Sequence, residues 1–413
     1  MLFIRGTVVH TPVRGHVEVL LDRLLVVDVD GGGKIASMVS GEEEANCLAL
    51  YSGQAEDVLR LSADQFLLPG FIDTHIHAPQ YAFAGTATDT PLMDWLNKYT
   101  FPTEARFASD PAFARHVYGR LIRRLIGGGT TTALFFATLH LEPCQLLADL
   151  LEQAGMRAFV GKVSMDRNGG PGLGQLAAVH DVLVQSHIRE SYDEAAFVGQ
   201  LEEAQGGAVS EAELFDAAGL LTSKAVFAHG VLLSEAELAL MAARGSAVAH
   251  CPLSNMFFAD VVLPVAKLLR QGVKVGLGTD VAGGYDSSML AAQRAAVVAS
   301  LALHAQRIAA APDPAQLALR YQAEGDADVL SWKDALWLAT VGGAQALGLE
   351  DVGTLAVGCQ FDALLVDGGC GVAYDLFPQT SQLDCIEKFL TLGDDRHIAQ
   401  VWVQGRPIKH PQQ

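Results

Sequence analysis

The chain has 413 residues, of which 50% are hydrophobic and 18% charged, enough apolar material for a barrel-sized domain with a smaller one attached. Its formal net charge of −19 disfavours a nucleic-acid partner, since few basic residues are available to neutralise phosphates. The six cysteines are scattered without C-x-x-C spacing, which disfavours a disulfide framework. No signal peptide and no uninterrupted 18-residue apolar stretch is recognisable, so we expect a cytoplasmic protein with no membrane span.

Both ends of the chain have the pattern of short strands and turns. Residues 1–66 contain FIRGTVVH, VEVLLDRLLVVDVDG and KIASMVSG, and similar text returns after residue 349 in VGTLAVGCQFDALLVD and IAQVWVQGRPI. Such apolar runs, rich in β-branched residues and bounded by turn residues, are typical of strands. We therefore expect one small β-sandwich domain formed by residues 1–66 and 350–413, with a second domain, 67–349, inserted between its halves.

The central residues alternate strand-like and helix-like patterns, which is typical of βα units around a parallel sheet. Seven candidate strands follow in chain order: LLPGFIDTHIH, TTTALFFATLH, RAFVGKV, DVLVQSH, KAVFAHG, SAVAHCP and VKVGLGTD. A closed (β/α)8 barrel needs eight. Only 18 residues, from Ser164 to Asp181, separate the third candidate from the next, and a βαβ unit takes about 30. We predict an α/β, TIM-like (β/α)8 barrel that lacks one βα unit, the fourth.

Four of these runs end in a histidine or an aspartate, where apolar residues give way to small or polar ones: His75, His77, His187, His229 and Asp280. The C-terminal ends of barrel strands meet at one face, and two residues two apart on a strand project from the same side. A single histidine at a strand end is more often a core or turn residue, but the repetition favours a metal site. Imidazoles with one carboxylate suit Zn²⁺, and we expect one ion.

The motif PGFIDTHIHAPQYAFAG resembles the guanine deaminases of the amidohydrolase superfamily. The likeness continues through WLNKYTFP, GGGTTTALFFATLH, QSHIRE, AHGVLLSEAEL, AHCPLSN, GTDVAGGYDSSML and FLTLGDDRHI, from about Leu67 to Val401. The H-x-H, H-x-x-E and G-T-D patterns belong to metal-dependent deaminases and hydrolases in general, whereas HAPQYAFAG, WLNKYTFP and GTDVAGGYDSSML are narrower. The resemblance implies zinc-dependent hydrolysis of the small purine guanine to xanthine and ammonia, and a homodimer.

The resemblance also implies a role for each matching residue. His75, His77, His187, His229 and Asp280 correspond to the zinc ligands, and Asp280 doubles as a base toward the bound water. Glu190 corresponds to a proton-shuttling glutamate, and Gln80 to an amide that binds the purine ring. The implied substrate-binding residues are His77, Gln80, His187, Glu190 and Asp280.

The chemistry needs these groups independently of the resemblance. Replacing an aromatic C–NH₂ by C=O requires a nucleophile, a proton for the ring and a proton for the departing amine. Zinc lowers the pKa of a bound water towards about 7, Glu190 can carry the protons, and His229 could stabilise the forming oxyanion. The alternative for Glu190 is a solvated residue at a helix start, where the dipole favours acidic side chains. Without the resemblance, Gln80 is an ordinary loop residue.

Other residues near these motifs have less specific expected roles. His250 ends another strand, and we expect it and Asn255 to be structural or to support the ligands. A group of aromatic residues could stack on a purine, although packing is the more typical use of most of them: Tyr81, Phe83, Trp95, Tyr99 and Phe101.

The chain departs from the family pattern at one place. The family has a further βα segment between MDRN and QSH, with an Arg–Phe pair that holds the guanine ring, whereas RNGGPGLGQLAAVHDVL bridges the two motifs directly here. Two alternative functions follow. One is a related aminohydrolase acting on another amino-heterocycle, such as a triazine, an adenosine-like compound or cytosine. The other is a catalytically inactive scaffold that binds proteins, which the intact ligand set and Glu190 disfavour.

Overall fold

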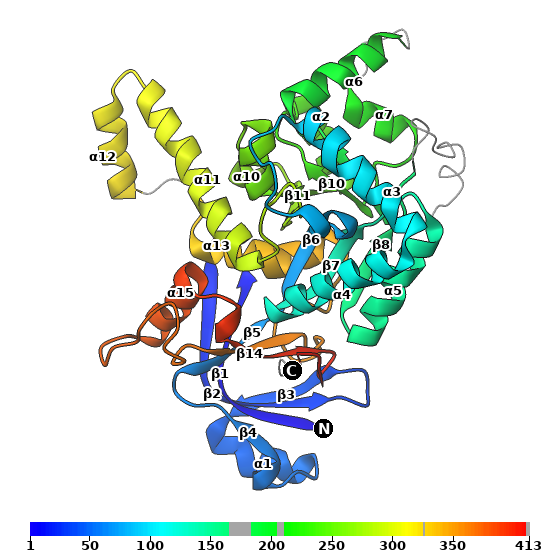
Figure 1. Ribbon diagram of the computed structural model, residues 1–413. Coiled ribbons are helices and arrows are strands. Elements are labelled where there is room, and N and C mark those ends of the chain that lie inside the picture. The colour runs from blue at the N-terminus through cyan, green and yellow to red at the C-terminus, as the bar shows by residue number, and fades with distance from the viewer. Residues whose placement is uncertain (165–182, 205–209, 325–326, 410–413) are drawn as a thin grey trace.

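The structure, a computed structural model, describes residues 1–164, 183–204, 210–324 and 327–409. Figure 1 shows two parts, a sheet drawn below and a group of strands surrounded by helices above it. The lower sheet joins strands from both halves of the chain, in the order β15-β14-β13-β5-β1-β2-β3, with β4 paired to β1. Its strands are β1 (Leu2–Val13), β2 (His16–Asp28), β3 (Lys34–Ser40), β4 (Val58–Arg60), β5 (Gln65–Pro69), β13 (Ala363–Asp367), β14 (Ile398–Val403) and β15 (Arg406–Pro407).

Hydrogen bonds join these eight strands into one sheet, which differs from the two layers of the expected β-sandwich. The sheet curls until β3 meets the segment that leads into β13. Ile35 N–H donates to the carbonyl of Cys359 at 2.8 Å, and Gly358 N–H donates to the carbonyl of Ile35 at 2.8 Å. The curled sheet encloses an apolar cluster that includes Ile4, Leu25 and Phe361. A single bent sheet thus provides the interior that a sandwich would form from two.

The upper part contains seven parallel strands in the described residues, at the positions expected from the sequence. Neighbouring strands pair in parallel within two sheets, β6-β7-β8 and β12-β11-β10-β9. Their bounds are β6 (Phe71–His77), β7 (Thr130–Phe136), β8 (Arg157–Gly161), β9 (Val184–Ile188), β10 (Ala225–His229), β11 (Ala247–His250) and β12 (Lys274–Leu277). Residues 165–182, where the fourth βα unit would have to lie, are outside the described residues.

The first and last of these strands are joined just beyond their ladders. Asp280 N–H donates to the carbonyl of His75 at 2.9 Å, and His77 N–H donates to the carbonyl of Val281 at 3.0 Å. The Asp73 carboxylate accepts from Thr279 N–H at 3.0 Å and from Thr279 Oγ1 at 2.6 Å. These bonds bring the end of β6 and the loop after β12 to one point.

Helices follow most strands and cover the outside of the upper part (Figure 1). The sequence sets their ends: Ser234 caps α8 in a capping box with Glu237, and Gly245, at φ +70°, ends that helix in a left-handed conformation that glycine adopts readily. The bounds are α1 (Glu44–Leu50), α2 (Leu92–Trp95), α3 (Phe101–Ser109), α4 (Pro111–Gly127), α5 (Leu141–Ala154), α6 (Tyr192–Ala204), α7 (Glu211–Ala217), α8 (Glu235–Arg244), α9 (Pro252–Ser254), α10 (Val265–Arg270), α11 (Met289–Ala310), α12 (Pro314–Glu324), α13 (Trp332–Trp337), α14 (Gly343–Ala346) and α15 (Gln382–Leu392).

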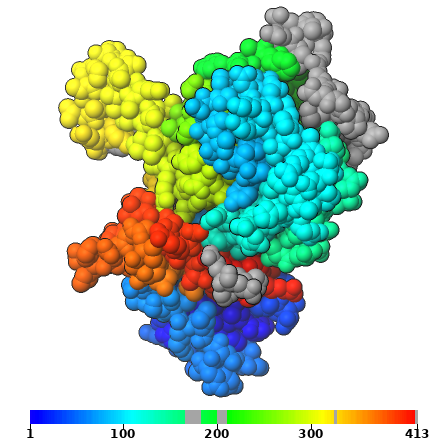
Figure 2. Space-filling view, in the orientation of Figure 1, coloured from blue at the N-terminus to red at the C-terminus, as the bar shows by residue number. Residues whose placement is uncertain are grey.

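The two parts share a continuous apolar core. One cluster contains Phe66 and Leu364 from the lower sheet together with Ile76 and Phe227 from the upper strands. Figure 2 shows that α11 and α12, in yellow, stand out from this body. Among the described helices, none is long and apolar enough to cross a membrane.

The division into domains needs one adjustment. β5 pairs with β1 and β13 of the lower sheet, so the expected boundary after residue 66 falls inside this strand. We propose that the division falls at Gly70, between β5 and β6, and keep 350–413 as the second segment of the small domain.

Candidate metal and active site

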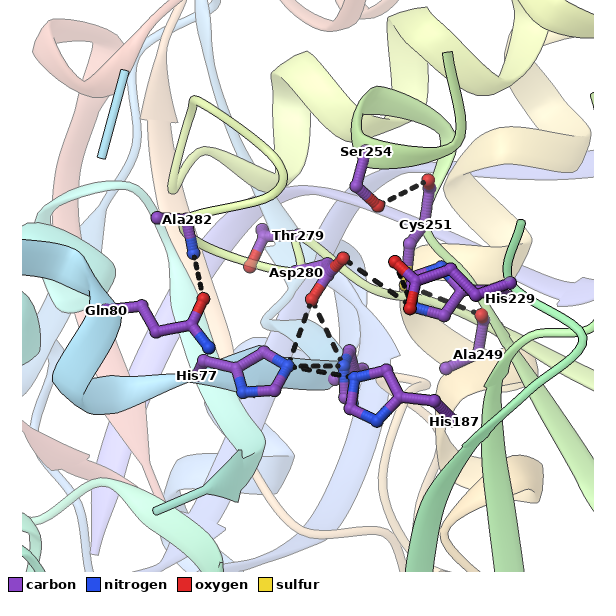
Figure 3. A network of polar contacts seen from close by, with 12 residues as sticks. His77, Gln80, His187, His229, Ala249, Cys251, Ser254, Thr279, Asp280 and Ala282 are labelled. Carbon is purple, nitrogen blue, oxygen red and sulfur yellow. Dashed lines mark hydrogen bonds and ion pairs between the residues drawn. The ribbon is translucent and has the colours of Figure 1, made fainter. Parts of the chain in front are cut away.

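Each expected ligand lies at or just beyond the C-terminal end of an upper strand. His75 and His77 are on β6, His187 is on β9, and His229 is the last residue of β10. Asp280 lies three residues after β12. Figure 3 shows the labelled side chains turned toward one another. The parallel strands deliver these groups to one face because all of them run in the same direction.

The distances confirm that these side chains come together. His77 Nε2 lies 3.1 Å from His75 Nε2 and 3.0 Å from His187 Nε2. Asp280 Oδ1 lies 3.1 Å from His75 Nε2 and 3.3 Å from His77 Nε2, and Asp280 Oδ2 lies 3.7 Å from His229 Nε2. Ligand atoms of one group of four, which does not include His77, all lie within 4.8 Å of one another: His75, His187, His229 and Asp280.

The protonation of this cluster suits a metal. Burial lowers the pKa of His75 to about 4 and lowers the pKa of His187 well below its usual range. Burial also lowers the pKa of His229. Burial opposes the ionisation of Asp280, but hydrogen bonds with His75 and His77 outweigh it and hold the Asp280 pKa well below its usual range. Neutral imidazoles beside an ionised carboxylate are the forms that bind a metal.

Two amides orient the histidine rings. Asn255 Oδ1 lies 2.9 Å from His229 Nδ1, so it accepts a hydrogen bond from that N–H. This leaves Nε2, which is buried and has no hydrogen-bond partner in the described residues, as a ligand atom. Gln185 Nε2 lies 2.7 Å from His75 Nδ1, and Gln185 Oε1 has no hydrogen-bond partner in the described residues. With the amide rotated so that its oxygen faces His75, Gln185 would accept a hydrogen bond from Nδ1–H in the same way. The cluster therefore fits a zinc ion.

Glu190 lies beside the cluster and is not a solvated helix residue. Its Oε1 is 3.4 Å from His229 Nε2, and its side chain is only 14% exposed. Burial, followed by the negative charge of Asp280, raises the pKa of Glu190 well above its usual range. Two neighbouring carboxylates whose pKa values are pushed apart form the pattern of an acid and a base.

Gln80 is buried at the edge of the cluster, in η3 (Ala78–Phe83), which follows β6 directly. Its Oε1 accepts from Ala282 N–H at 3.4 Å, as Figure 3 shows. Its Nε2 donates to Glu104 Oε1 at 3.2 Å. The amide thus spans from the loop after β12 to α3, next to the metal ligands.

The remaining expected residues have mainly structural contacts. His250 is buried at the end of β11, where its carbonyl accepts from Gly278 N–H at 2.8 Å. Trp95 packs against Phe83 and Phe258, with ring centroids 5.2 and 5.0 Å away, and its indole N–H donates to the Thr86 carbonyl.

Several residues of the site were not expected from the sequence. Phe136, at the end of β7, places its ring centroid 4.8 Å from that of His77 and 5.2 Å from that of His187. Gln185, Glu104 and Asp73 also contact site residues. The position of Gln185 two residues before His187 could have suggested a shared strand face, but nothing local distinguishes Glu104 from an ordinary helix residue.

A strand barrel with a histidine–aspartate cluster at its C-terminal face defines a metal-dependent hydrolase. A model described as "Amidohydrolase family" matches residues 66–176 and 172–408, and the chain belongs to this family. It is 38% identical to a guanine deaminase of Rattus norvegicus, with 98% of this chain and 96% of the relative covered. That alignment spans 460 positions, more than the 413 residues of this chain, so part of it has no counterpart here.

Solved structures give the same relationship. A guanine deaminase from C. acetobutylicum with bound guanine is 28% identical, with a TM-score of 0.82 and coverage of 98% of this chain and 99% of that one. An adenosine deaminase from Xanthomonas campestris with bound zinc is 25% identical, with a TM-score of 0.74 and coverage of 98% and 92%.

Proposed function

We propose that this protein hydrolyses guanine to xanthine and ammonia with one bound Zn²⁺. The observation that carries the proposal is the convergence of four histidines and Asp280 beside a buried Glu190, in a chain similar to guanine deaminases over nearly its whole length. The donor set fits zinc. The zinc in the adenosine deaminase structure supports that choice of ion.

The metal would be held by His75, His77, His187, His229 and Asp280. Bound there, zinc would lower the pKa of a coordinated water towards about 7, so that the water can attack at neutral pH. The neutral histidines leave Asp280 as the charged ligand of the site. Asp280 is ionised and faces the cluster through both oxygens, so it can accept a proton from the attacking water.

Glu190 would move the other protons. Its raised pKa favours the protonated carboxyl group, which can donate to the ring nitrogen beside the carbon under attack. It would then take a proton from the hydroxyl group added to that carbon and deliver it to the amino group that leaves as ammonia, and the proton held by Asp280 would return to Glu190. Glu190 Oε1 lies 3.4 Å from His229 Nε2, which places this carboxyl group beside the atoms that would hold the metal. Water supplies the oxygen of xanthine, and the carbon–nitrogen bond to the amino group breaks.

Gln80 would recognise the edge of the purine. Its side chain is 5% exposed and lies beside His77 at the mouth of the cluster. A primary amide offers donors and acceptors together, which matches the mixed pattern of a guanine edge.

The substrate choice is also affected by the proposed loss of the fourth βα unit. The two family-model matches overlap at residues 172–176, between β8 and β9. The alignment to the rat relative is longer than this chain. In the described residues, β8 is an edge strand of one sheet and β9 is an edge strand of the other. The missing unit would carry the Arg–Phe pair of the family, so a different amino-heterocycle, or an inactive scaffold, is the competing function.

Ammonia release from a panel of bases tests the function. The zinc-loaded protein should convert guanine to xanthine faster than it deaminates cytosine, an aminotriazine or adenosine. Turnover of cytosine without guanine would favour the related aminohydrolase. Elemental analysis of the protein and of His75→Ala separates the scaffold, because a scaffold would hold no zinc in either form.

Assembly and location are also proposals. We infer a homodimer in the cytoplasm, supported only by the resemblance to guanine deaminases and by the charge and composition of the chain. Sedimentation velocity of the zinc-loaded protein tests the dimer.

A further inference from the structure

We propose that Glu104 is a positioning residue that fixes the orientation of the Gln80 amide, and through it the recognition of the substrate. The inference rests on the proposed function, since Gln80 is the residue assigned to the purine edge. Glu104 comes from α3, 24 residues after Gln80 in the chain.

Two partners of opposite character hold the amide. Ala282 offers a backbone N–H, which can only donate, at 3.4 Å from Gln80 Oε1. Glu104 offers a carboxylate oxygen, which accepts when ionised, at 3.2 Å from Gln80 Nε2. An amide can be rotated by 180° at little cost when its partners are neutral to the exchange. Here rotation would place oxygen against oxygen and nitrogen against nitrogen, so one orientation is fixed.

The Ala282 contact alone is a weak restraint. Its donor–acceptor distance is at the long end for an N–H···O bond, whereas a hydrogen bond to a carboxylate is stronger than a neutral one. Glu104 therefore provides most of the energy that selects the orientation.

The surroundings of Glu104 suit such a role. No lysine or arginine in the described part of the chain pairs with its carboxylate, and its printed hydrogen bond goes to Gln80. Burial raises the pKa of Glu104, and the Gln80 hydrogen bond offsets only part of this rise. A partly buried carboxylate with no cationic partner costs stability. The contact between Glu104 and Gln80 gives a functional reason for this loss of stability.

The fixed amide has a defined remaining capacity. One of its two N–H groups and one oxygen lone pair are still free after the contacts to Glu104 and Ala282. A ligand therefore meets a donor and an acceptor in a set order, and a base that presents an acceptor and a donor in the complementary order binds best. Without Glu104 the amide could rotate, and the positions of its donor and acceptor would no longer be fixed.

A double-mutant cycle on guanine binding tests the inference. Guanine affinity is measured by calorimetry in zinc-loaded Glu190→Gln protein, which removes the expected proton carrier so that binding is separated from turnover. Glu104→Leu and Gln80→Ala are added to it singly and together. Each single change should weaken binding about tenfold, the worth of a hydrogen bond to a charged group. The double variant should bind no more weakly than Gln80→Ala alone, because Glu104 acts through Gln80.

Two further variants separate positioning from a general structural effect. Glu104→Gln keeps an acceptor and should recover most of the affinity, whereas Glu142→Gln, an exposed glutamate on α5, should change nothing. Zinc content should stay constant through the cycle, and no variant should melt at a lower temperature than the parent protein. In protein that retains Glu190, Glu104→Leu should raise KM for guanine and leave kcat nearly unchanged.

The outcomes are distinct from those for the function itself. Equal losses for Glu104→Leu with and without Gln80, or no loss at all, would overturn the positioning role. If the effects of Glu104→Leu and Gln80→Ala on guanine affinity are coupled but the protein releases no ammonia from guanine, the proposed reaction is wrong and the positioning role stands. Failure of the parent protein to bind guanine would overturn both.

Discussion

Thr279 Oγ1 donates a 2.6 Å hydrogen bond to Asp73 Oδ2, and neither side chain is exposed to solvent. This bond connects β6 to the loop after β12, two residues before His75 and one residue before Asp280. Asp73 also accepts from the backbone N–H groups of His75 and Thr279. One carboxylate therefore sets the relative position of the first and last strands and of the ligands they carry.

Removing this bond should destabilise the protein and loosen the site. Thr279→Val keeps the side-chain volume but leaves Asp73 with its backbone donors only. The free energy of unfolding, measured by urea denaturation, should fall by about 1–3 kcal/mol, the cost of leaving a buried polar atom without its partner. Thr222→Val is the control, because in the described part of the chain the Thr222 hydroxyl accepts from the nearby Lys224 N–H alone. An unchanged unfolding midpoint in Thr279→Val would argue against this connection.

Asn255 should matter for zinc affinity rather than for folding. Asn255→Leu removes the acceptor at His229 Nδ1 and frees the ring to turn. Zinc affinity should fall by about 10–100-fold, as when other ligand-orienting partners are lost, measured by competition with a chelator. Asn97→Ala is matched to it, since Asn97 makes only an exposed contact to the Met93 carbonyl. Equal affinity in Asn255→Leu and Asn97→Ala would contradict the orienting role.

Glu190→Gln should separate chemistry from metal binding. The amide keeps the shape of the side chain but cannot donate and recover a proton as the acid does. We expect kcat for ammonia release to fall by about 10²–10⁴-fold while the zinc content stays at the wild-type value. A variant that keeps its rate would show that the protons travel by another route.

Besides the shared apolar core, an ion pair between Arg157 and Asp362 connects the two parts of the fold. Arg157, at the start of β8, forms paired hydrogen bonds of 3.0–3.3 Å to the 3% exposed carboxylate of Asp362, next to β13. Asp362→Ala leaves a guanidinium without its partner and should cost about 3–5 kcal/mol of unfolding free energy. Arg106→Ala, which breaks an exposed pair with Asp110, should cost less than about 1 kcal/mol. Similar losses in both variants would contradict the distinction.

A pH dependence should arise at Glu44 on α1. Hydrogen bonds from Arg60, together with those from Arg5, lower the pKa of Glu44 to about 2. Since the pKa is lower in the folded protein, the stabilisation is complete above the ordinary value near 4.5 and is lost as the pH falls towards 2. Glu44→Gln should therefore reduce the difference in stability between pH 6 and pH 3. An identical pH profile would show that the ion pairs contribute nothing.

The sequence predicted the parts of the fold that depend on local pattern. All seven upper strands and the five converging side chains were expected, because apolar runs and the residues that end them are visible along the chain. The Gln80 contact to Glu104 and the Gln185 contact to His75 could not be read, since each joins segments that only tertiary packing brings together. The domain boundary stays a prediction: residue 66 lies inside β5, and only Pro69 and Gly70 separate the apolar residues of β5 from those that begin β6.

Anomalous diffraction at the zinc edge tests the central claim most directly. Crystals of zinc-loaded protein should show one strong peak among His75, His77, His187, His229 and Asp280, at about 2.0–2.2 Å from the ligand atoms. A protein without a peak there, or with its zinc held by other side chains, would contradict the account.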